Sequence, residues 1–203
     1  MIEKLKSQVG KDLEQHNSAS ETRVTFGFWV YLMTDCVLFA SLFATYAVLH
    51  GSTFGGPSSR DLFDLPFVFV ETILLLTSSF TAGLMMLALH KQNKRLVLTL
   101  LGVTFLLGLS FVAMELTEFT HLAVDGNSWS RSGFLSAFFT LVGTHGLHIT
   151  VGLIWMTILG ARIIRFDITR VTARRLLLFS MFWHFLDVIW IFIFTVVYLM
   201  GVL

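Results

Sequence analysis

Five long runs of apolar residues divide this chain, and each approaches or exceeds the length that crosses a bilayer. About 20 consecutive apolar residues are needed for a helix to traverse the hydrocarbon core. Because lipid offers no hydrogen bonds to the backbone, uninterrupted runs of this length predict helices. The sequence therefore predicts an all-α integral membrane protein with five transmembrane helices. We place these helices at residues 24–49, 66–89, 96–119, 133–159 and 176–202.

The composition agrees with this class of protein. Hydrophobic residues make up 55% of the 203 residues and charged residues only 13%, whereas a soluble domain carries roughly 25% charged residues. Cys36 is the single cysteine of the sequence and lies inside the first apolar run. Because a disulfide and a cysteine-pair metal or redox centre both need two cysteines, both are excluded within the chain. We expect no secretory signal peptide, because the first 23 residues are charged and the first apolar run is too long for one.

The distribution of positive charge predicts the orientation of the chain. Every Lys and Arg other than Arg60 and Arg131 lies in the N-terminal tail, the second connection or the fourth connection. Connections that are rich in Lys and Arg remain on the cytoplasmic side of a membrane. We therefore expect residues 1–23 to form a cytoplasmic N-terminal tail and residues 24–203 to form the transmembrane domain, with the C-terminus in the periplasm.

Ionisable residues fall near the middle third of the predicted membrane. They are Asp35, His145, His148, His184 and Asp187, placed by a rise of about 1.5 Å per helical residue. An ionisable group at the bilayer centre costs about 2.5–3.5 kcal/mol on insertion scales and usually faces protein or water. His184 and Asp187 are one helical turn apart, so they can hydrogen-bond each other and lower the cost for both.

The residues by themselves leave three interpretations open. In the first, the histidines and Asp187 hold neighbouring helices together. In the second, the two histidines of T-H-G-L-H (144–148) bind a haem or a metal together with His184. In the third, protons pass through Asp35 and this polar layer, because a carboxyl group in an apolar site can exchange protons.

A second acidic group lies toward the predicted periplasmic face. Glu71 follows the second predicted helix start by one turn, and Glu115 and Glu118 occupy the last turns of the third helix. The simplest expectation is that glutamates near this face reach the membrane–water interface. Glu71 fits that expectation least well, because Leu, Phe and Val residues surround it in the sequence.

Several stretches together resemble one family of membrane proteins. In chain order they are GFWVYLMTDCVLFASLFATY (27–46), LPFVFVETILLLTSS (65–79), RSGFLSAFFTLVGTHGLHITVGLIW (131–155) and FWHFLDVIWIFIFTVVYLMG (182–201). Through them, residues 24–201 resemble subunit III of the haem–copper respiratory oxidases. The five-helix form and the run R-S-G-F-L-S-A-F-F are more similar to the cytochrome bo-type ubiquinol oxidase branch than to the seven-helix mitochondrial form.

This resemblance implies an accessory, cofactor-free and non-catalytic subunit of a proton-translocating quinol:oxygen oxidoreductase in a bacterial inner membrane. Haem and copper are then expected in subunit I of the complex, which is also the expected main contact, with subunits II and IV nearby. Phospholipids are implied as further partners, and nucleic acid is not. The implied role is to stabilise subunit I and to support proton uptake and lipid-mediated oxygen access.

The resemblance also suggests roles for single residues. Asp35 matches a carboxylate, often Glu in the family, that reacts with carbodiimides in the seven-helix relatives and is tied there to sustained proton uptake. We therefore expect Asp35 and Glu71 to be the proton-related residues. His145, His148, His184 and Asp187 are then expected to form a structural polar network, with no catalytic, cofactor or metal site in the chain.

Other functions remain as alternatives. The chain is alternatively subunit III of a cytochrome c oxidase, an independent small membrane transporter or proton channel, or a membrane haem protein that uses His145 or His148 with His184.

Overall fold

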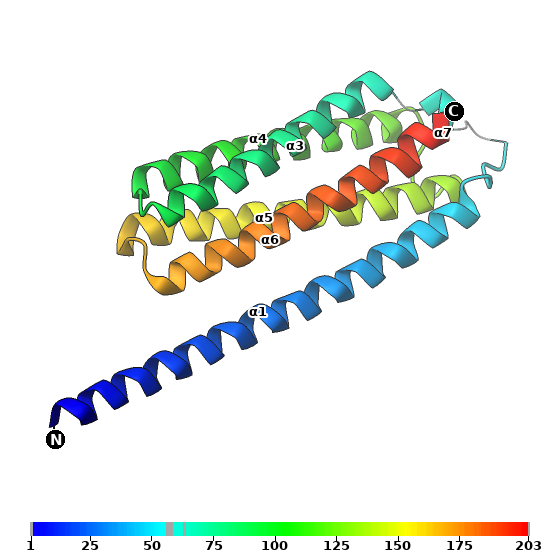
Figure 1. The fold of residues 1–203 in the computed structure, drawn as a ribbon. Helices are drawn as coiled ribbons and strands as arrows, with labels where there is room; N and C mark the ends of the chain where they lie inside the picture. The colour runs from blue at the N-terminus through cyan, green and yellow to red at the C-terminus, as the bar shows by residue number, and fades with distance from the viewer. Residues whose placement is uncertain (1, 56–58, 63, 203) are drawn as a thin grey trace. The chain divides into compact units, whose positions relative to one another are not determined.

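The computed structural model describes residues 2–55, 59–62 and 64–202 of the chain, which are mainly helical. Four long helices follow the first one, and a short helix lies in the first connection (Figure 1). The elements are α1 (Ile2–Leu49), α2 (Ser59–Leu62), α3 (Leu65–His90), α4 (Lys94–Val124), α5 (Gly133–Phe166), α6 (Arg170–Ile193), the π-helical stretch η1 (Phe194–Leu199) and α7 (Met200–Val202).

The prediction of five membrane-spanning helices is confirmed. Within the described residues, five helical segments are long and apolar enough to cross a membrane, at Thr22–Leu49, Leu65–His90, Lys94–Val124, Gly133–Phe166 and Arg170–Leu199. Several helices extend past the predicted ends. The fourth continues to Phe166 and the fifth begins at Arg170, because hydropathy marks the lipid-buried part of a helix while backbone hydrogen bonding continues through polar residues.

The chain divides into two units, Met1–Leu38 and Phe39–Leu203. In the first unit the described backbone is one uninterrupted helix from Ile2. The predicted tail therefore continues helically into the first spanning segment. The second unit begins within α1 and contains all the other helices.

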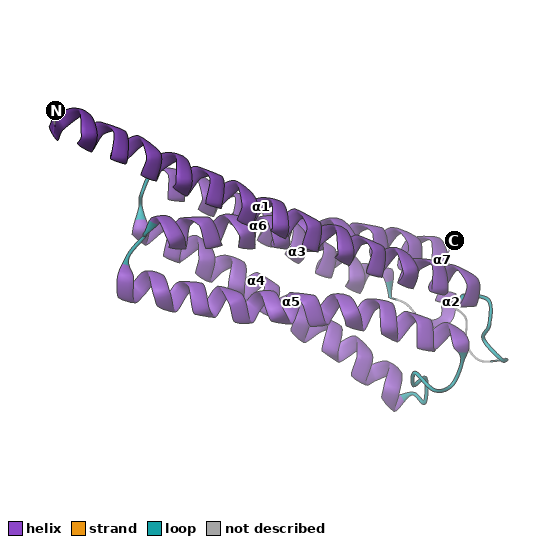
Figure 2. Cartoon of the chain, turned by 90° about the horizontal axis from the view of Figure 1, so that it is seen from below, coloured by secondary structure: helices purple, strands orange, loops and turns teal. Residues whose placement is uncertain are grey.

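The second unit is built around a ring of four helices. Helix α3 packs on α4, α4 on α5, α5 on α6, and α6 back on α3, and Figure 2 shows these helices running alongside one another. The connections after α3, α4 and α5 are short, which makes successive helices antiparallel. Helices α3 and α5 begin, and α4 and η1 end, at one end of this bundle (Figure 1), which we call the C-terminal end.

Polar side chains at the start of three helices hydrogen-bond to free backbone N–H groups. Asn93 accepts from the Leu96 N–H at 3.2 Å, and Ser132 accepts from the Leu135 N–H at 3.2 Å. Thr169 accepts from the N–H three residues later, also at 3.2 Å. A side-chain acceptor of this kind stabilises a helix start by about 1 kcal/mol.

Trp183 of α6 fills the centre of the bundle, where it is 1% exposed. Its indole N–H donates to the Ser78 hydroxyl of α3 at 2.7 Å. A Cβ added at Gly108 of α4 would lie 2.9 Å from the indole ring, and one added at Gly152 of α5 would lie 2.7 Å from it. Glycine at both positions therefore leaves room for the ring, so that one side chain joins all four helices.

The last spanning segment changes its helical pitch at η1. A π-helical turn holds more residues than an α-helical turn and shifts which side chains face inward. Val197 and Tyr198 are both fully buried in this stretch. The Val197 carbonyl accepts from the Tyr46 hydroxyl at 3.4 Å, which links η1 to the end of α1 within the second unit.

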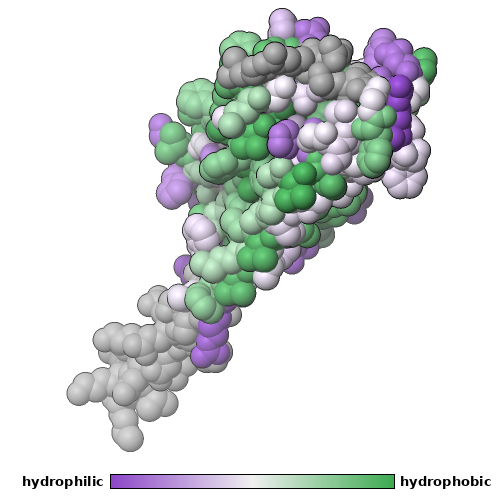
Figure 3. Space-filling view, turned by 90° about the vertical axis from the view of Figure 1, so that its right-hand side faces the viewer, coloured by the Kyte–Doolittle hydropathy of each residue, from purple (hydrophilic) through white to green (hydrophobic). Residues whose placement is uncertain are grey.

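Large apolar side chains remain exposed on each of the four bundle helices. Examples are Phe80 on α3, Leu106 on α4, Leu147 on α5 and Val188 on α6. Hydrophobic residues also reach the molecular surface in the space-filling view (Figure 3). Exposed apolar surface of this extent is unusual for a monomeric soluble protein, and it is what a bundle surrounded by lipid or by other membrane subunits presents.

Candidate functional site

Three glutamates of α3 and α4 meet inside the bundle near its C-terminal end. Glu71 is 0% exposed and Glu115 is 3% exposed. Glu71 interacts electrostatically with both Glu118 and Glu115, and Glu115 interacts with Glu118. We call Glu71, Glu115 and Glu118 the glutamate cluster.

The cluster has few hydrogen bonds for groups buried so deeply. The Tyr198 hydroxyl of η1 donates to the Glu118 carboxylate at 2.9 Å. Both carboxylate oxygens of Glu71 and Oε1 of Glu115 are buried without a hydrogen-bond partner among the described residues. Buried polar atoms normally have a partner in the protein or in ordered water, so these oxygens require water, protons or an ion.

A glycine on α5 makes space for the second of these carboxylates. A Cβ added at Gly146 would lie 2.5 Å from Oε1 of Glu115, so the carboxylate lies directly against the α5 backbone. Any larger residue at this position would displace it. In the sequence Gly146 lies between two histidines. Only the structure shows that the absence of a side chain at Gly146 leaves room for a glutamate of another helix.

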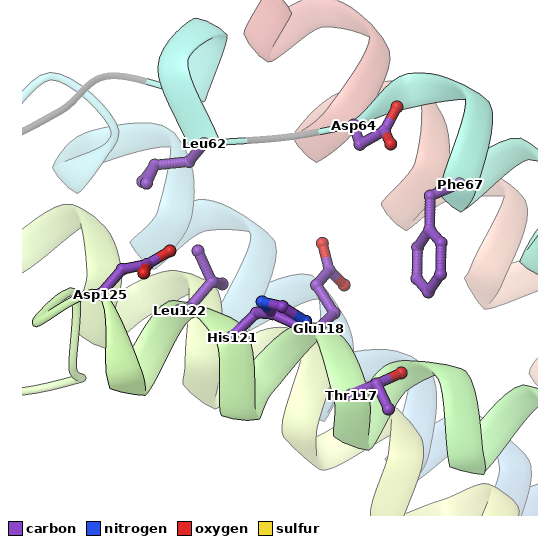
Figure 4. Close-up of a pocket in the computed structure, with 8 residues that line it drawn as sticks. All are labelled: Leu62, Asp64, Phe67, Thr117, Glu118, His121, Leu122 and Asp125. Carbon is purple, nitrogen blue, oxygen red and sulfur yellow. The ribbon is translucent and has the colours of Figure 1, made fainter.

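A pocket of about 570 Å³ opens beside the cluster at the C-terminal end of the bundle. Its lining includes Glu118, His121 and Asp125 of the α4 end and Asp64 before α3. Figure 4 shows the Glu118 side chain reaching from α4 into the space between α4 and the start of α3. Glu118 therefore belongs both to the buried cluster and to the wall of an accessible pocket.

Trp190 of α6 contacts two neighbours of the cluster, Thr72 and Tyr198. Its indole N–H donates to the hydroxyl of Thr72, the residue after Glu71, at 3.1 Å. Its ring packs edge-on against Phe111 at a centroid distance of 4.6 Å and lies 6.2 Å from the Tyr198 ring. These contacts hold α3, α4 and η1 together around the three carboxylates.

His145 is enclosed by aromatic rings on the far side of Trp190. Its ring centroid lies 5.2 Å from Trp190, 5.9 Å from Phe111 and 6.3 Å from Phe39. The side chain is 0% exposed, and neither ring nitrogen has a hydrogen-bond partner among the described residues. His148 lies one turn later, and its Nδ1 donates to the Thr144 carbonyl at 2.7 Å.

His184 and Asp187 lie elsewhere, in a groove of about 400 Å³ between α3 and α6. From the sequence we expected that His184 and Asp187 can hydrogen-bond each other. In the structure, the Nδ1 of His184 instead donates to the Ser180 carbonyl of its own helix at 2.7 Å. The two side chains still interact electrostatically, and Ser79 of α3 lines the same groove. The four residues of the predicted polar network thus lie in two places, with His145 and His148 on α5 and with His184 and Asp187 in the groove beside α6.

Replacing Asp187 by leucine is expected to reduce the amount of subunit that assembles in the membrane. The Asp187 carboxylate is buried and interacts electrostatically with His184, so leucine would remove the acidic neighbour that lowers the cost of placing an imidazole in the membrane. That cost is about 2.5–3.5 kcal/mol for an ionisable group at the bilayer centre. The measurement is the level of chain in detergent-solubilised membranes by immunoblot after native electrophoresis. Asp187→Asn, which keeps a polar side chain of the same shape, should recover most of that level. Equal levels for the leucine variant and the unsubstituted chain would contradict this prediction.

Asp35 lies on α1 in the first unit. The Tyr31 side chain, one turn earlier on the same helix, interacts with its carboxylate. Asp35 and Glu71, the two residues expected to be proton-related, thus belong to different units of the chain.

The structure does not bring the histidines together as metal ligands. Among the described residues, no group of three or more His, Cys, Asp or Glu side chains could hold a metal ion. His145 lies among the rings of Phe111 and Trp190, whereas His184 lines the groove between α3 and α6. The interpretation of His145, His148 and His184 as a metal-binding set is therefore not supported by their positions.

The expectation that the glutamates simply reach the interface is wrong for Glu115. This residue is buried because its carboxylate lies against Gly146 of α5, and it lies more than two turns before the end of α4 at Val124. Tyr198 was not among the residues that the sequence singled out. The sequence indicated the cluster in two ways. All three glutamates fall toward the same predicted membrane face, and the spacing of Glu115 and Glu118 places both on one face of a helix.

Comparison with known proteins gives a consistent result over nearly the whole chain. The family model described as cytochrome c oxidase subunit III matches residues 7–202. The chain belongs to the cytochrome c oxidase subunit III family. The resemblance inferred from the sequence motifs is thereby confirmed.

Individual members of the subunit III family are similar over most of their length. Cytochrome bo(3) ubiquinol oxidase subunit 3 of Pseudomonas aeruginosa is 57% identical, covering 97% of this chain and 93% of the relative. Cytochrome c oxidase subunit 3 of Bacillus sp. is 42% identical, covering 98% of this chain and 97% of the relative. Quinol oxidase subunit 3 of Bacillus subtilis is 43% identical over 86% of each. The five spans and the glutamate cluster lie within the matched region.

Proposed function

We propose that this chain is the accessory subunit III of a proton-translocating ubiquinol:oxygen oxidoreductase in an aerobic respiratory chain. The observation that carries the proposal is the 57% identity to a cytochrome bo(3) ubiquinol oxidase subunit 3 over 97% of the chain. The five apolar spans support a multi-pass position in a bacterial inner membrane. The excess of Lys and Arg in the tail and in the second and fourth connections supports a cytoplasmic N-terminus and a periplasmic C-terminus.

In this proposal the chain performs no redox step itself. Subunit I carries the haem and copper and is the main contact, subunits II and IV complete the complex, and phospholipids fill the remaining space. The exposed apolar side chains on the bundle helices support contact with lipid and with membrane-embedded partners. The role of the chain is to stabilise subunit I and to support proton uptake through acidic residues, among which we place Asp35 and Glu71.

A cytochrome c oxidase is the second candidate for the parent complex. It is favoured by the 42% identity to a cytochrome c oxidase subunit 3 across 98% of the chain. That identity is lower than the identity to the ubiquinol oxidase subunit, which is why we place ubiquinol first.

Purification through a tag on this chain tests the proposal. The complex is extracted from native membranes in a mild detergent, and oxygen consumption is measured with ubiquinol and separately with reduced cytochrome c. We expect cyanide-sensitive consumption with ubiquinol to follow the tag. Consumption with cytochrome c alone would transfer the proposal to the second candidate. Recovery of the chain alone and inactive would contradict both candidates and favour an independent transporter or channel.

Replacing Asp35 by asparagine is expected to leave assembly intact but to make oxidase activity decay several-fold faster during turnover. Asparagine has nearly the shape of aspartate but cannot exchange a proton, so a supply of protons through this residue would fail. The measurement is the decay rate of oxygen consumption over many turnovers by the purified complex.

Asp167→Asn provides the matched control for that experiment. Asp167 follows α5, and asparagine has nearly the same shape. The ion pair of Asp167 with Lys94 at 2.5 Å is largely exposed and contributes little to stability. Its decay rate should match that of the unsubstituted complex. An unchanged decay rate for Asp35→Asn would remove Asp35 from any proton role.

A further inference from the structure

The hydrogen bonds of the glutamate cluster do not neutralise the negative charge that its three carboxylates would carry if all were ionised. Three ionised carboxylates within electrostatic range of one another would repel each other in a poorly hydrated interior. An isolated buried charge is far too costly to persist, and such a group binds a proton or a counter-ion instead. The Tyr198 hydroxyl contributes one hydrogen bond to the cluster but no positive charge.

Among the side chains that the structure describes, the titratable groups around the cluster offer little positive charge. On the elements that pack against it they are His121 of α4, His145 of α5, Tyr198 of η1 and Tyr46 of α1, with Asp64 and Asp125 at the pocket. Only the two histidines among these can become cationic. His145 is enclosed by Phe39, Phe111 and Trp190, and His121 lines the pocket and not the buried part of the cluster.

The arrangement of the carboxylates favours protons over a metal ion as the neutralising species. A hard cation requires about six oxygen ligands converging on one point, and within the described residues no group suited to a metal is found. Only Glu118 of the three glutamates lines the pocket, while Glu71 and Glu115 lie behind it with unpartnered oxygens. A proton can be handed inward from one carboxylate to the next, whereas a hydrated cation would need an open passage.

We propose that Glu71, Glu115 and Glu118 form a proton-binding site that exchanges protons with the aqueous phase at the C-terminal end of the bundle through Glu118. When the site loads, a hydronium ion in the pocket gives up a proton and an O–H bond forms on a carboxylate oxygen. When the site empties, that O–H bond breaks and the proton returns to water in the pocket. Glu71 and Glu115 hold the protons, Glu118 connects them to the pocket, and Tyr198 fixes the orientation of Glu118. The inference rests on the proposed proton role of Glu71, and it is independent of which electron donor the complex uses.

Infrared spectroscopy of the purified complex tests this site without reference to activity. A protonated carboxyl group has a C=O stretching band that carboxylates lack, and the band shifts when deuterium replaces the proton. Difference spectra between the unsubstituted complex and single Glu→Gln variants isolate the contribution of each residue. We expect Glu71→Gln and Glu115→Gln each to remove a carboxylic-acid component that shifts in deuterium oxide. Glu21→Gln, which precedes the first spanning segment, should remove none.

Two further variants address the connection to the pocket. Glu118→Gln should slow the deuterium exchange of the remaining buried acids several-fold, because the link to the pocket is lost. Tyr198→Phe should shift the carboxylate stretching band of Glu118 by removing its hydrogen bond while leaving the carboxylic-acid component of Glu71 in place. If Glu71→Gln does not assemble, the unsubstituted complex with isotope-labelled glutamate still reports whether buried protonated glutamate is present.

Several results would overturn the proposal. The first is the lack of any glutamic acid band in the labelled complex, and the second is a Glu71→Gln spectrum that matches the unsubstituted one. Elemental analysis that finds one retained metal ion, lost in both Glu71→Gln and Glu115→Gln, would replace the proton site by a cation site. Loss of ubiquinol oxidase activity from the tagged preparation would instead count against the proposed function and leave these spectra interpretable.

Discussion

Trp183→Ala is expected to destabilise the bundle by about 3–5 kcal/mol, the usual cost of truncating a large buried aromatic side chain. The ring is 1% exposed and lies against Gly108 and Gly152, so alanine would leave a cavity at the centre of four helices. It would also leave the Ser78 hydroxyl without the indole N–H that it accepts at 2.7 Å. The measurement is the free energy of unfolding of the purified subunit, obtained by titrating SDS into detergent micelles.

Trp129→Ala is the matched control, because Trp129 is 72% exposed in the connection between α4 and α5. The same chemical truncation at that position removes no interior contact of comparable size and should cost less than about 1 kcal/mol. If the two tryptophan variants lost similar free energies of unfolding, Trp183 would not be the central packing residue that the structure indicates.

Gly152→Ala is expected to cost about 1–3 kcal/mol, the range for inserting a methyl group into a tightly packed core. The added Cβ would lie 2.7 Å from the Trp183 ring, and the ring cannot retreat because Gly108 of α4 bounds it on another side. Alanine favours a helix interior over glycine by roughly 1 kcal/mol. We expect the steric cost of the contact with Trp183 to be larger than this gain, so that the variant is less stable. The same unfolding titration measures the net change.

Gly102→Ala is the control for this second prediction. A Cβ added at Gly102 has no neighbouring atom within 4 Å, so only the gain in helix propensity applies and stability should stay equal or rise. Opposite signs for Gly102→Ala and Gly152→Ala would show that the contact with Trp183, and not helix propensity, decides the result. A stabilising effect of Gly152→Ala would contradict the packing described for Trp183.

One sequence motif that carries the family resemblance contains residues with different structural roles. Trp183, His184 and Asp187 all belong to the FWHFLDVIW stretch that marks the family. The structure gives them separate tasks, since Trp183 fills the bundle centre while His184 and Asp187 line a groove between α3 and α6. The motif predicted the family correctly, but it could not distinguish a packing residue from a polar pair.

The five spans, their order and their approximate ends follow from the sequence alone. Length and hydropathy determine these features, because the cost of burying an unpaired backbone in lipid leaves a long apolar run only one conformation. The same reasoning predicted a helix at residues 66–89 with Glu71 about one turn after its start, and α3 (Leu65–His90) contains Glu71 in that position.

Only the tertiary structure decided which side chains meet. Hydropathy reports the depth of a residue in the membrane but not the direction in which it faces around its helix. That direction depends on how helices far apart in the chain interlock, as where Gly146 of α5 receives Glu115 of α4. The wide turn at η1 brings Tyr198 to Glu118, and no local pattern in the sequence predicts it. The glutamate cluster exists because packing between helices, and not the preference of any single helix, orients its members.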